Sequence, residues 1–179
     1  MTMFTQHTQE SAPPASRRAM AAVAAKQGYL PAAAALLAES PETLEGFLRL
    51  SAALDACTLD PVARKVVIMT VAARNGCRLC LAMHAARLAS LGAAPSLAAA
   101  LRAGAPLADA RLEAARAFAL RVLDTAGEVG DAALGEFLGH GFTRRNALEV
   151  VLGIGAYTLS TLANRLTGAP VDEQLQAFA

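Results

Sequence analysis

The stretch NGCRLCLAMH, residues 75–84, brings together two cysteines and a histidine that could do chemistry as a group. On a helix, residues three and seven positions apart share a face, so Cys77, Cys80 and His84 would form one stripe. The imidazole would lie one turn from Cys80 and could exchange a proton with its thiol. A nearby helix N-terminus lowers a thiol pKa from about 8.5. The spacing also allows Cys77 and Cys80 to close a disulfide within one turn.

Two other interpretations of these residues remain open, and two are rejected. Cysteine is among the most buried residue types, so the stripe could belong to a hydrophobic core. A zinc site would need a fourth ligand, and the spare candidates are Cys57, His7 and His140. Haem attachment is excluded because Leu81, and not a histidine, follows the second cysteine. A thioredoxin-type motif would follow a strand in a βαβ unit, and no such unit is visible.

The elements that must position the stripe are predicted to be helices. Alanine, the strongest helix former, supplies much of the 55% hydrophobic content, whereas aromatic residues make up only 4% of the chain. A chain of 179 residues is long enough for one domain with its own core. We therefore expect an all-α protein with a single compact domain over residues 17–179.

Several local signals place the ends of these helices. Residues 1–16 are polar, contain two adjacent prolines and show no helical period, so they are predicted to form a flexible N-terminal arm. Helix starts are expected at Pro31, after Ser40, at Asp60-Pro61, at Asp131 and at Thr143. Gly92 is expected to stop the helix that carries the cysteines. Leu112, Ala115, Phe118 and Val122 have the spacing of one buried helical face.

Composition argues against several classes of partner and location. The net charge of +1 gives no basic surface for nucleic acid. No apolar run reaches the roughly 18 uninterrupted residues of a membrane span. The short run after Arg18 is closed by Lys26 before it could serve as a signal peptide. We expect a cytoplasmic protein without cofactor or metal, whose thiols are reduced unless they are catalytic or redox-sensing.

The region 60–92, and especially VVIMTVAARNGCRLCLAMHAARLASLG, resembles the core motif of the carboxymuconolactone decarboxylase superfamily on its alkylhydroperoxidase D-like (AhpD-like) branch. A weaker likeness extends from about residue 21 to 172 and includes GHGFTRRNALEVV and NRLTGAPVD. The cysteine pair distinguishes this branch from the decarboxylases proper. The resemblance implies an all-helical fold, assembly into trimers or hexamers, and reduction of a hydroperoxide substrate. An external dithiol, such as a lipoylated protein, would act as the reductant.

The resemblance also implies a role for each residue of the stripe. Cys80 would be oxidised to sulfenic acid, Cys77 would resolve it, and His84 would take part in the proton relay. Two departures weaken that relay. Lys65 stands where the family usually has a glutamate, and Leu79 replaces a histidine found just before the second cysteine. A protonated lysine favours a thiolate but cannot accept a proton.

Residues outside the motif give a few further expectations. RKVVIMTVAA and LEVVLGIGAY align without gaps, which places Glu149 opposite Lys65. Glu149 is therefore a candidate substitute carboxylate or ion-pair partner, although a structural role is favoured. Tyr157 and Asn164 are assigned to the active site or to a subunit contact. A lyase of the decarboxylase type and a non-catalytic redox sensor are the competing functions.

Overall fold

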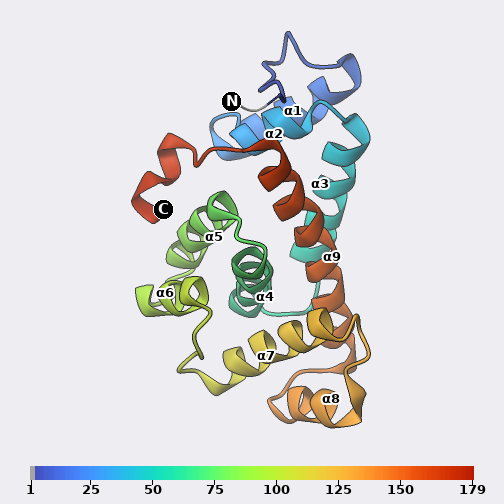
Figure 1. Ribbon diagram of the computed structural model, residues 1–179, viewed down its shortest axis with the longest axis vertical. Helices are drawn as coiled ribbons and strands as arrows, with labels where there is room; N and C mark the ends of the chain where they lie inside the picture. The colour runs from blue at the N-terminus through green and yellow to red at the C-terminus, as the bar shows by residue number, and fades with distance from the viewer. Residues whose placement is uncertain (1–2) are drawn as a thin grey trace.

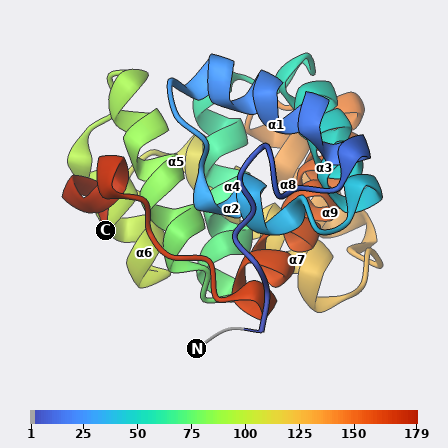
Figure 2. The ribbon, with the colours of Figure 1, turned by 90° about the horizontal axis from the view of Figure 1, so that it is seen from above.

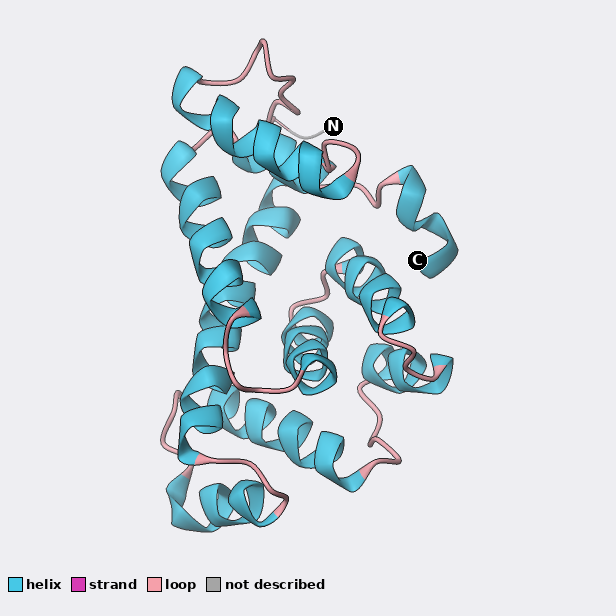
Figure 3. Ribbon diagram, turned by 180° about the vertical axis from the view of Figure 1, so that it is seen from behind, coloured by secondary structure: helices cyan, strands magenta, loops and turns pink. Residues whose placement is uncertain are grey.

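The computed structural model of the protein describes residues 3–179, and all regular structure within that range is helical (Figures 1 and 3). The elements are α1 (Pro14–Gln27), α2 (Ala32–Leu37), α3 (Pro41–Asp55), α4 (Pro61–Arg74), α5 (Arg78–Ser90), α6 (Pro95–Ala103), α7 (Ala110–Asp124), α8 (Gly130–Gly139), α9 (Arg144–Thr167) and a 3-10 helix, η1 (Glu173–Phe178). The predicted all-α class and single compact domain are confirmed.

Helix α4 is the centre of the molecule. It packs against α5, α6, α7 and α9, and Figure 1 shows it nearly end-on, enclosed by these helices. Its apolar run from Val66 to Ala72 is buried almost throughout. Burial of this kind, at about 25 cal/mol per Å² of apolar surface, is the main force that holds such a fold together. The helix that precedes the cysteines is therefore a rigid support for them.

The side chains predicted to start helices do so at most positions. Ser40 accepts a hydrogen bond from the Thr43 N–H at 3.3 Å, and Asp60 accepts one from the Ala63 N–H at 2.9 Å. Thr143 opens α9 with a reciprocal capping box. The predicted cap at Asp131 is wrong, because α8 begins one residue earlier and Asp131 lies inside its first turn.

The N-terminal segment lies against the domain, contrary to the expected arm. Met1 and Thr2 lie outside the described residues, but the His7 N–H donates to the Ala35 carbonyl at 3.2 Å. Ser16 is buried, and its hydroxyl donates to the Ala38 carbonyl at 2.6 Å. The adjacent prolines that suggested a break instead start α1, because a proline at the first helical position sacrifices no hydrogen bond.

The C-terminal segment fixes the position of α2. The Asp172 carboxylate accepts a hydrogen bond from the Ala32 N–H at 2.9 Å, at the start of α2. Beyond it, η1 packs against α5. Figure 2 shows α1 and α2 together on one side of the molecule, where α1 contacts α3 and α2 contacts both α3 and α9. These contacts place α2 beside the helices that carry the candidate site.

Helix α9 is anchored by a buried carboxylate near its N-terminus. Glu149 is 7% exposed and accepts hydrogen bonds from the N–H groups of Thr58 and Leu59, each at 2.9 Å. The Asn146 amide donates to it at 2.8 Å, and Arg145 forms an ion pair with it at 3.0 Å. Glu149 thus closes the loop between α3 and α4 onto α9.

By length and composition alone, α9 is the one helix in residues 3–179 that could cross a membrane. In the fold, 44% of its most apolar 18-residue window is buried inside the protein, against α3, α4 and α7. The buried carboxylate of Glu149 lies in the same helix. This pattern is typical of the core helix of a globular domain.

Candidate functional site

The turn between α4 and α5 sets the position of the two cysteines. Gly76 has φ of 65°, a left-handed conformation that glycine adopts without steric cost. A side chain there would also meet Arg165, since an ideal Cβ would lie 2.8 Å from its Nη1. The Asn75 amide donates to the Thr161 hydroxyl at 2.8 Å, which ties the turn to α9. The Asn-Gly pair therefore ends α4 and allows a new helix to begin at once.

The two cysteines open α5 and are joined as a disulfide, with their Cα atoms 5.3 Å apart. Cys77 is the N-cap residue, and its sulfur accepts a hydrogen bond from the Cys80 N–H at 3.3 Å. The motif thus lies at a true helix start and not at a kink in one long helix. Cys80 is 3% exposed, yet it lines a cavity, whereas Cys77 does not. A molecule in this cavity would reach the sulfur of Cys80 first.

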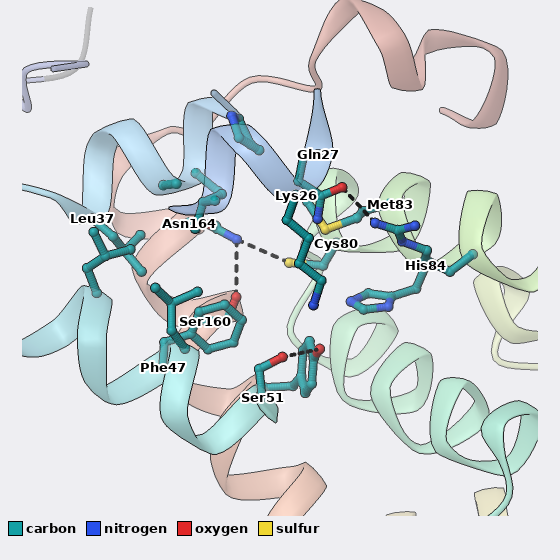
Figure 4. A pocket seen from close by; sticks show the side chains of 18 of the residues that line it. Lys26, Gln27, Leu37, Phe47, Ser51, Cys80, Met83, His84, Ser160 and Asn164 are labelled. Atoms are coloured by element: carbon teal, nitrogen blue, oxygen red, sulfur yellow. Dashed lines mark hydrogen bonds between the residues drawn. The ribbon is translucent and has the colours of Figure 1, made fainter. Parts of the chain in front are cut away.

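Asn164, on α9, binds the sulfur of Cys80. Its side-chain amide donates to Sγ at 3.3 Å, as Figure 4 shows. The same side chain lies 3.5 Å from the Ser160 hydroxyl, while its carbonyl oxygen is buried and has no hydrogen-bond partner. An amide donor stabilises a thiolate relative to a thiol. Asn164 therefore lies at the site, one of the two positions expected for it, and it is equipped to lower the pKa of a reduced Cys80.

His84 lies one turn after Cys80 and is 5% exposed at the cavity wall. Its ring and that of Tyr157 form a T-shaped pair with the ring centroids 5.0 Å apart. Burial, followed by the positive charges of Lys65 and Arg87, holds the pKa of His84 well below its usual 6.5. The ring is therefore neutral at pH 7. Its Nδ1 is buried without a hydrogen-bond partner and can accept a proton.

Lys65 lines the same cavity and is half-buried. Burial lowers its pKa from the usual 10.5, while the nearby carboxylate of Asp55 opposes that shift. Asp55, at the C-terminal end of α3, also lines the cavity. The sequence analysis missed it, although Leu44, Phe47, Leu48, Ser51 and Asp55 follow each other at helical spacing and all line this cavity.

Glu149 is not the carboxylate of this site. It is absent from the cavity wall, and its ion pair is with Arg145 and not with Lys65. The structural role favoured for it from the sequence is confirmed. The alignment that placed it opposite Lys65 compares two helices that pack against each other, but Glu149 faces the loop before α4.

The cavity has a volume of about 360 Å³, and its wall comes from six helices (Figure 4). The apolar part of the wall includes Val23, Leu37, Leu44, Phe47, Leu48 and Met83. The Tyr157 hydroxyl lies 3.5 Å from that of Ser51, on the polar side of the wall. Burial raises the pKa of Tyr157, so the phenol keeps its proton. The site therefore combines an apolar wall with a few polar groups, as small-molecule sites commonly do.

The remaining sequence candidates lie elsewhere. Leu79 is buried with Cys77 and Ala82 and does not line the cavity. Two arginines that flank the cysteines also lie outside the cavity: Arg74 pairs with Asp124, and Arg78 is exposed. The arginine at the cavity is Arg87, which the sequence analysis did not single out.

Cys57 is partly buried at the edge of the main core. His7 is engaged with Glu39 at 2.7 Å, and His140 ends α8. In residues 3–179, no group of three or more His, Cys, Asp or Glu side chains is arranged to hold a metal ion. The spare zinc ligands considered from the sequence do not gather at the cysteine pair.

Comparison with known proteins gives one family match and several similar structures. Residues 41–121 match the model of the carboxymuconolactone decarboxylase family. This segment is less than half of the chain and is similar to that family, and the fold of the whole chain is AhpD-like. The family resemblance drawn from the cysteine motif is thus confirmed. No curated protein matches the sequence significantly.

Two similar structures are peroxidase-related proteins of bacteria. One, from Ralstonia eutropha JMP134, is described as an alkylhydroperoxidase AhpD core and has a TM-score of 0.85 at 23% identity, over 97% of this chain and 94% of its own. The other, from Silicibacter sp. TM1040, has a TM-score of 0.80 at 21% identity, over 97% and 92% of the two chains. A third similar structure is the debrominase Bmp8 in complex with 2,3,4-tribromopyrrole, with a TM-score of 0.76 at 16% identity, over 99% and 96%. One fold therefore serves proteins of different activity.

Proposed function

We propose that this protein is a dithiol peroxidase, in which Cys80 reacts with a hydroperoxide and Cys77 closes the disulfide. The observation that carries this proposal is the placement of Cys80. Its sulfur lines the cavity, accepts a hydrogen bond from Asn164 and lies within disulfide range of Cys77. The sulfur of Cys77 does not line the cavity, so a bound molecule would not reach it.

In the first step, the thiolate of Cys80 attacks the terminal oxygen of the hydroperoxide. An S–O bond forms, the O–O bond breaks, and the departing alkoxide takes up a proton to become an alcohol. The neutral ring of His84 would accept the proton of the thiol, and its unpartnered Nδ1 supports this role. Asp55 lines the same cavity and supplies a carboxylate, the group that is lost where Lys65 replaces the family glutamate.

In the second step, the thiolate of Cys77 attacks the sulfur of the Cys80 sulfenic acid. The S–S bond forms, the S–O bond breaks, and hydroxide leaves and is protonated to water. An external dithiol then reduces the disulfide by two exchange reactions and is itself oxidised. A cycle that needs such a reductant suits the cytoplasm, and a lipoylated protein is the reductant we propose.

Steady-state assays with cumene hydroperoxide and dihydrolipoamide test this cycle. Cys80→Ser should abolish turnover, and Cys77→Ser should stop at a sulfenic acid on Cys80 that dimedone traps. Cys57→Ser is the matched control and should keep wild-type turnover, because Cys57 does not line the cavity. Full peroxidase activity in Cys80→Ser would contradict the proposal.

A redox sensor is the second candidate, and Lys65 is the observation that favours it. A protonated lysine cannot accept a proton as the family glutamate does, so the disulfide would be reduced slowly and would persist after the peroxide is consumed. The sensor would form the Cys77–Cys80 disulfide with one equivalent of peroxide and would not turn over with any dithiol. The decarboxylase-type lyase is the remaining alternative, and turnover of a lactone by a variant lacking both cysteines would identify it.

We also propose that α9 mediates self-association of the chain. Five large apolar side chains of α9 are exposed and recur at intervals of three, four or eight residues: Leu148, Val151, Leu159, Leu162 and Leu166. Gly155 lies within this series with open space around it. Sedimentation of wild type and of Leu162→Glu tests the proposal, because a charge in this apolar series should shift the protein toward monomer.

A further inference from the structure

Three cationic side chains surround the cavity that contains Cys80. Lys26 comes from the last turn of α1, Lys65 from α4 and Arg87 from the last turn of α5. Asp55 is the one carboxylate among the described residues that line this cavity. Because His84 is neutral, the wall carries an excess of positive charge.

These cations are not neutralised within the fold. In residues 3–179, none of the three forms an ion pair. The Arg87 guanidinium donates to the Gln27 side-chain oxygen at 2.6 Å, which fixes it at the cavity without cancelling its charge. Figure 4 shows the Lys26 amine pointing into the cavity, toward the space between Cys80 and His84. The charges of Lys65 and Arg87 also reach His84, since both help to lower its pKa.

A second part of the cavity wall is apolar. Leu37, Leu44, Phe47 and Leu48 come from α2 and α3, and Leu37 and Leu44 are buried. A small neutral peroxide would leave both this wall and the cations without a partner. A ligand with a hydrocarbon body and one negative charge would satisfy both, because burial of apolar surface and charge-assisted hydrogen bonds would act on the same molecule.

We propose that the site selects hydroperoxides that carry a carboxylate, with the carboxylate held by Lys26, Lys65 and Arg87 and the hydrocarbon part held by the apolar wall. This inference rests on the proposed peroxidase function. The carboxylate is unchanged in the reaction. The hydroperoxide is reduced to a hydroxy acid and water, while the two thiols are oxidised to the disulfide.

A matched pair of substrates tests the selectivity. One is cumene hydroperoxide with a para carboxylate, and the other is the methyl ester of the same compound, which keeps the ring and the peroxide but loses the charge. In wild type, kcat/KM for the acid should exceed that for the ester by about tenfold, the range of one charge-assisted hydrogen bond. This ratio should fall toward one in Lys26→Met and in Arg87→Met.

Arg18→Met is the matched control, because it removes one positive charge from an exposed position of α1 outside the cavity. It should keep the wild-type ratio. If Arg18→Met lowers the ratio as much as Lys26→Met does, general attraction by the protein's charge explains the preference, and the proposed site is wrong.

A binding experiment separates this inference from the peroxidase proposal. Calorimetry measures the affinity of the oxidised protein for the alcohol products of the acid and of the ester, and it needs no turnover. Preferential binding of the carboxylate without peroxidase turnover would support the anion site and overturn the peroxidase. Equal turnover and equal binding of the two compounds would overturn the anion site and leave the peroxidase standing.

Discussion

Glu149→Gln should lower the stability of the protein by an amount that depends on pH. Burial by itself would raise the pKa of Glu149, but the hydrogen bonds from Thr58, Asn146 and Leu59 outweigh it and lower the pKa from 4.5 to about 2. A carboxylate with a lower pKa in the folded than in the unfolded protein stabilises the fold wherever it is ionised in both states. The difference corresponds to about 3 kcal/mol at pH 7, because one pKa unit is about 1.4 kcal/mol.

The sign of the pH dependence follows from the same values. The contribution is complete above the unfolded pKa of 4.5 and disappears as pH falls through the folded pKa of about 2. At pH 3 about 1.4 kcal/mol of it should remain. Urea unfolding of the oxidised protein at pH 7 and pH 3 measures both values. The gap in unfolding free energy between wild type and Glu149→Gln should narrow by about 2 kcal/mol between these pH values.

Glu136→Gln is the matched control for this experiment. Glu136 is exposed on α8, so the same loss of charge should change the unfolding free energy by less than about 0.5 kcal/mol. A Glu149→Gln variant whose stability runs parallel to that of wild type from pH 7 to pH 3 would refute the reasoning. In that case the amide would replace the carboxylate without loss, and Glu149 would not hold the loop as an anion.

Three further outcomes are expected. Gly155→Ala should stabilise the monomer by about 0.5–1 kcal/mol in urea unfolding, because within one chain the new Cβ meets open space. Gly153→Ala should gain less or destabilise, because its Cβ would lie 3.2 Å from a valine methyl. Asn164→Ala should raise the pKa of Cys80 in the reduced protein by about one unit, measured by the pH dependence of iodoacetamide alkylation. The unfolding free energy of wild type should fall as pH drops below 6.5, by up to about 1.4 kcal/mol per pH unit, because His84 binds a proton in the unfolded state and stays neutral in the folded state. In His84→Phe this dependence on pH should disappear.

The sequence was sufficient for the features that depend on local physics. Alanine content predicted helices, and Ser40, Asp60 and Thr143 marked their starts because each side chain satisfies its own helix N-terminus. Asp131 misled because aspartate favours both the cap and the first turn, where it meets the positive end of the helix dipole. The prolines at residues 13 and 14 misled because proline is compatible with both a linker and a helix start.

The parts of the site that depend on tertiary packing could not be read in this way. Asp55 reaches the cavity because α3 approaches it from a separate part of the chain, and it belongs to no recognisable motif. Arg87 follows His84 by three positions on α5, so helical spacing could have indicated it. Glu149 could not be placed because its partners, Thr58 and Leu59, are about 90 positions away in the sequence. The cysteine motif was readable because its members lie within two helical turns.

The walls of the cavity have a consequence for how such a protein can evolve. The segment that matches the family, residues 41–121, contains both cysteines and His84. Val23, Lys26 and Leu37 lie before that segment, and Asn164 lies after it, yet all four line the cavity. Mutations in these flanking helices can change which molecules bind in the cavity, while the cysteine pair and the turn before it stay the same. Lineages that share the same redox centre can thus diverge in substrate through the ends of the chain.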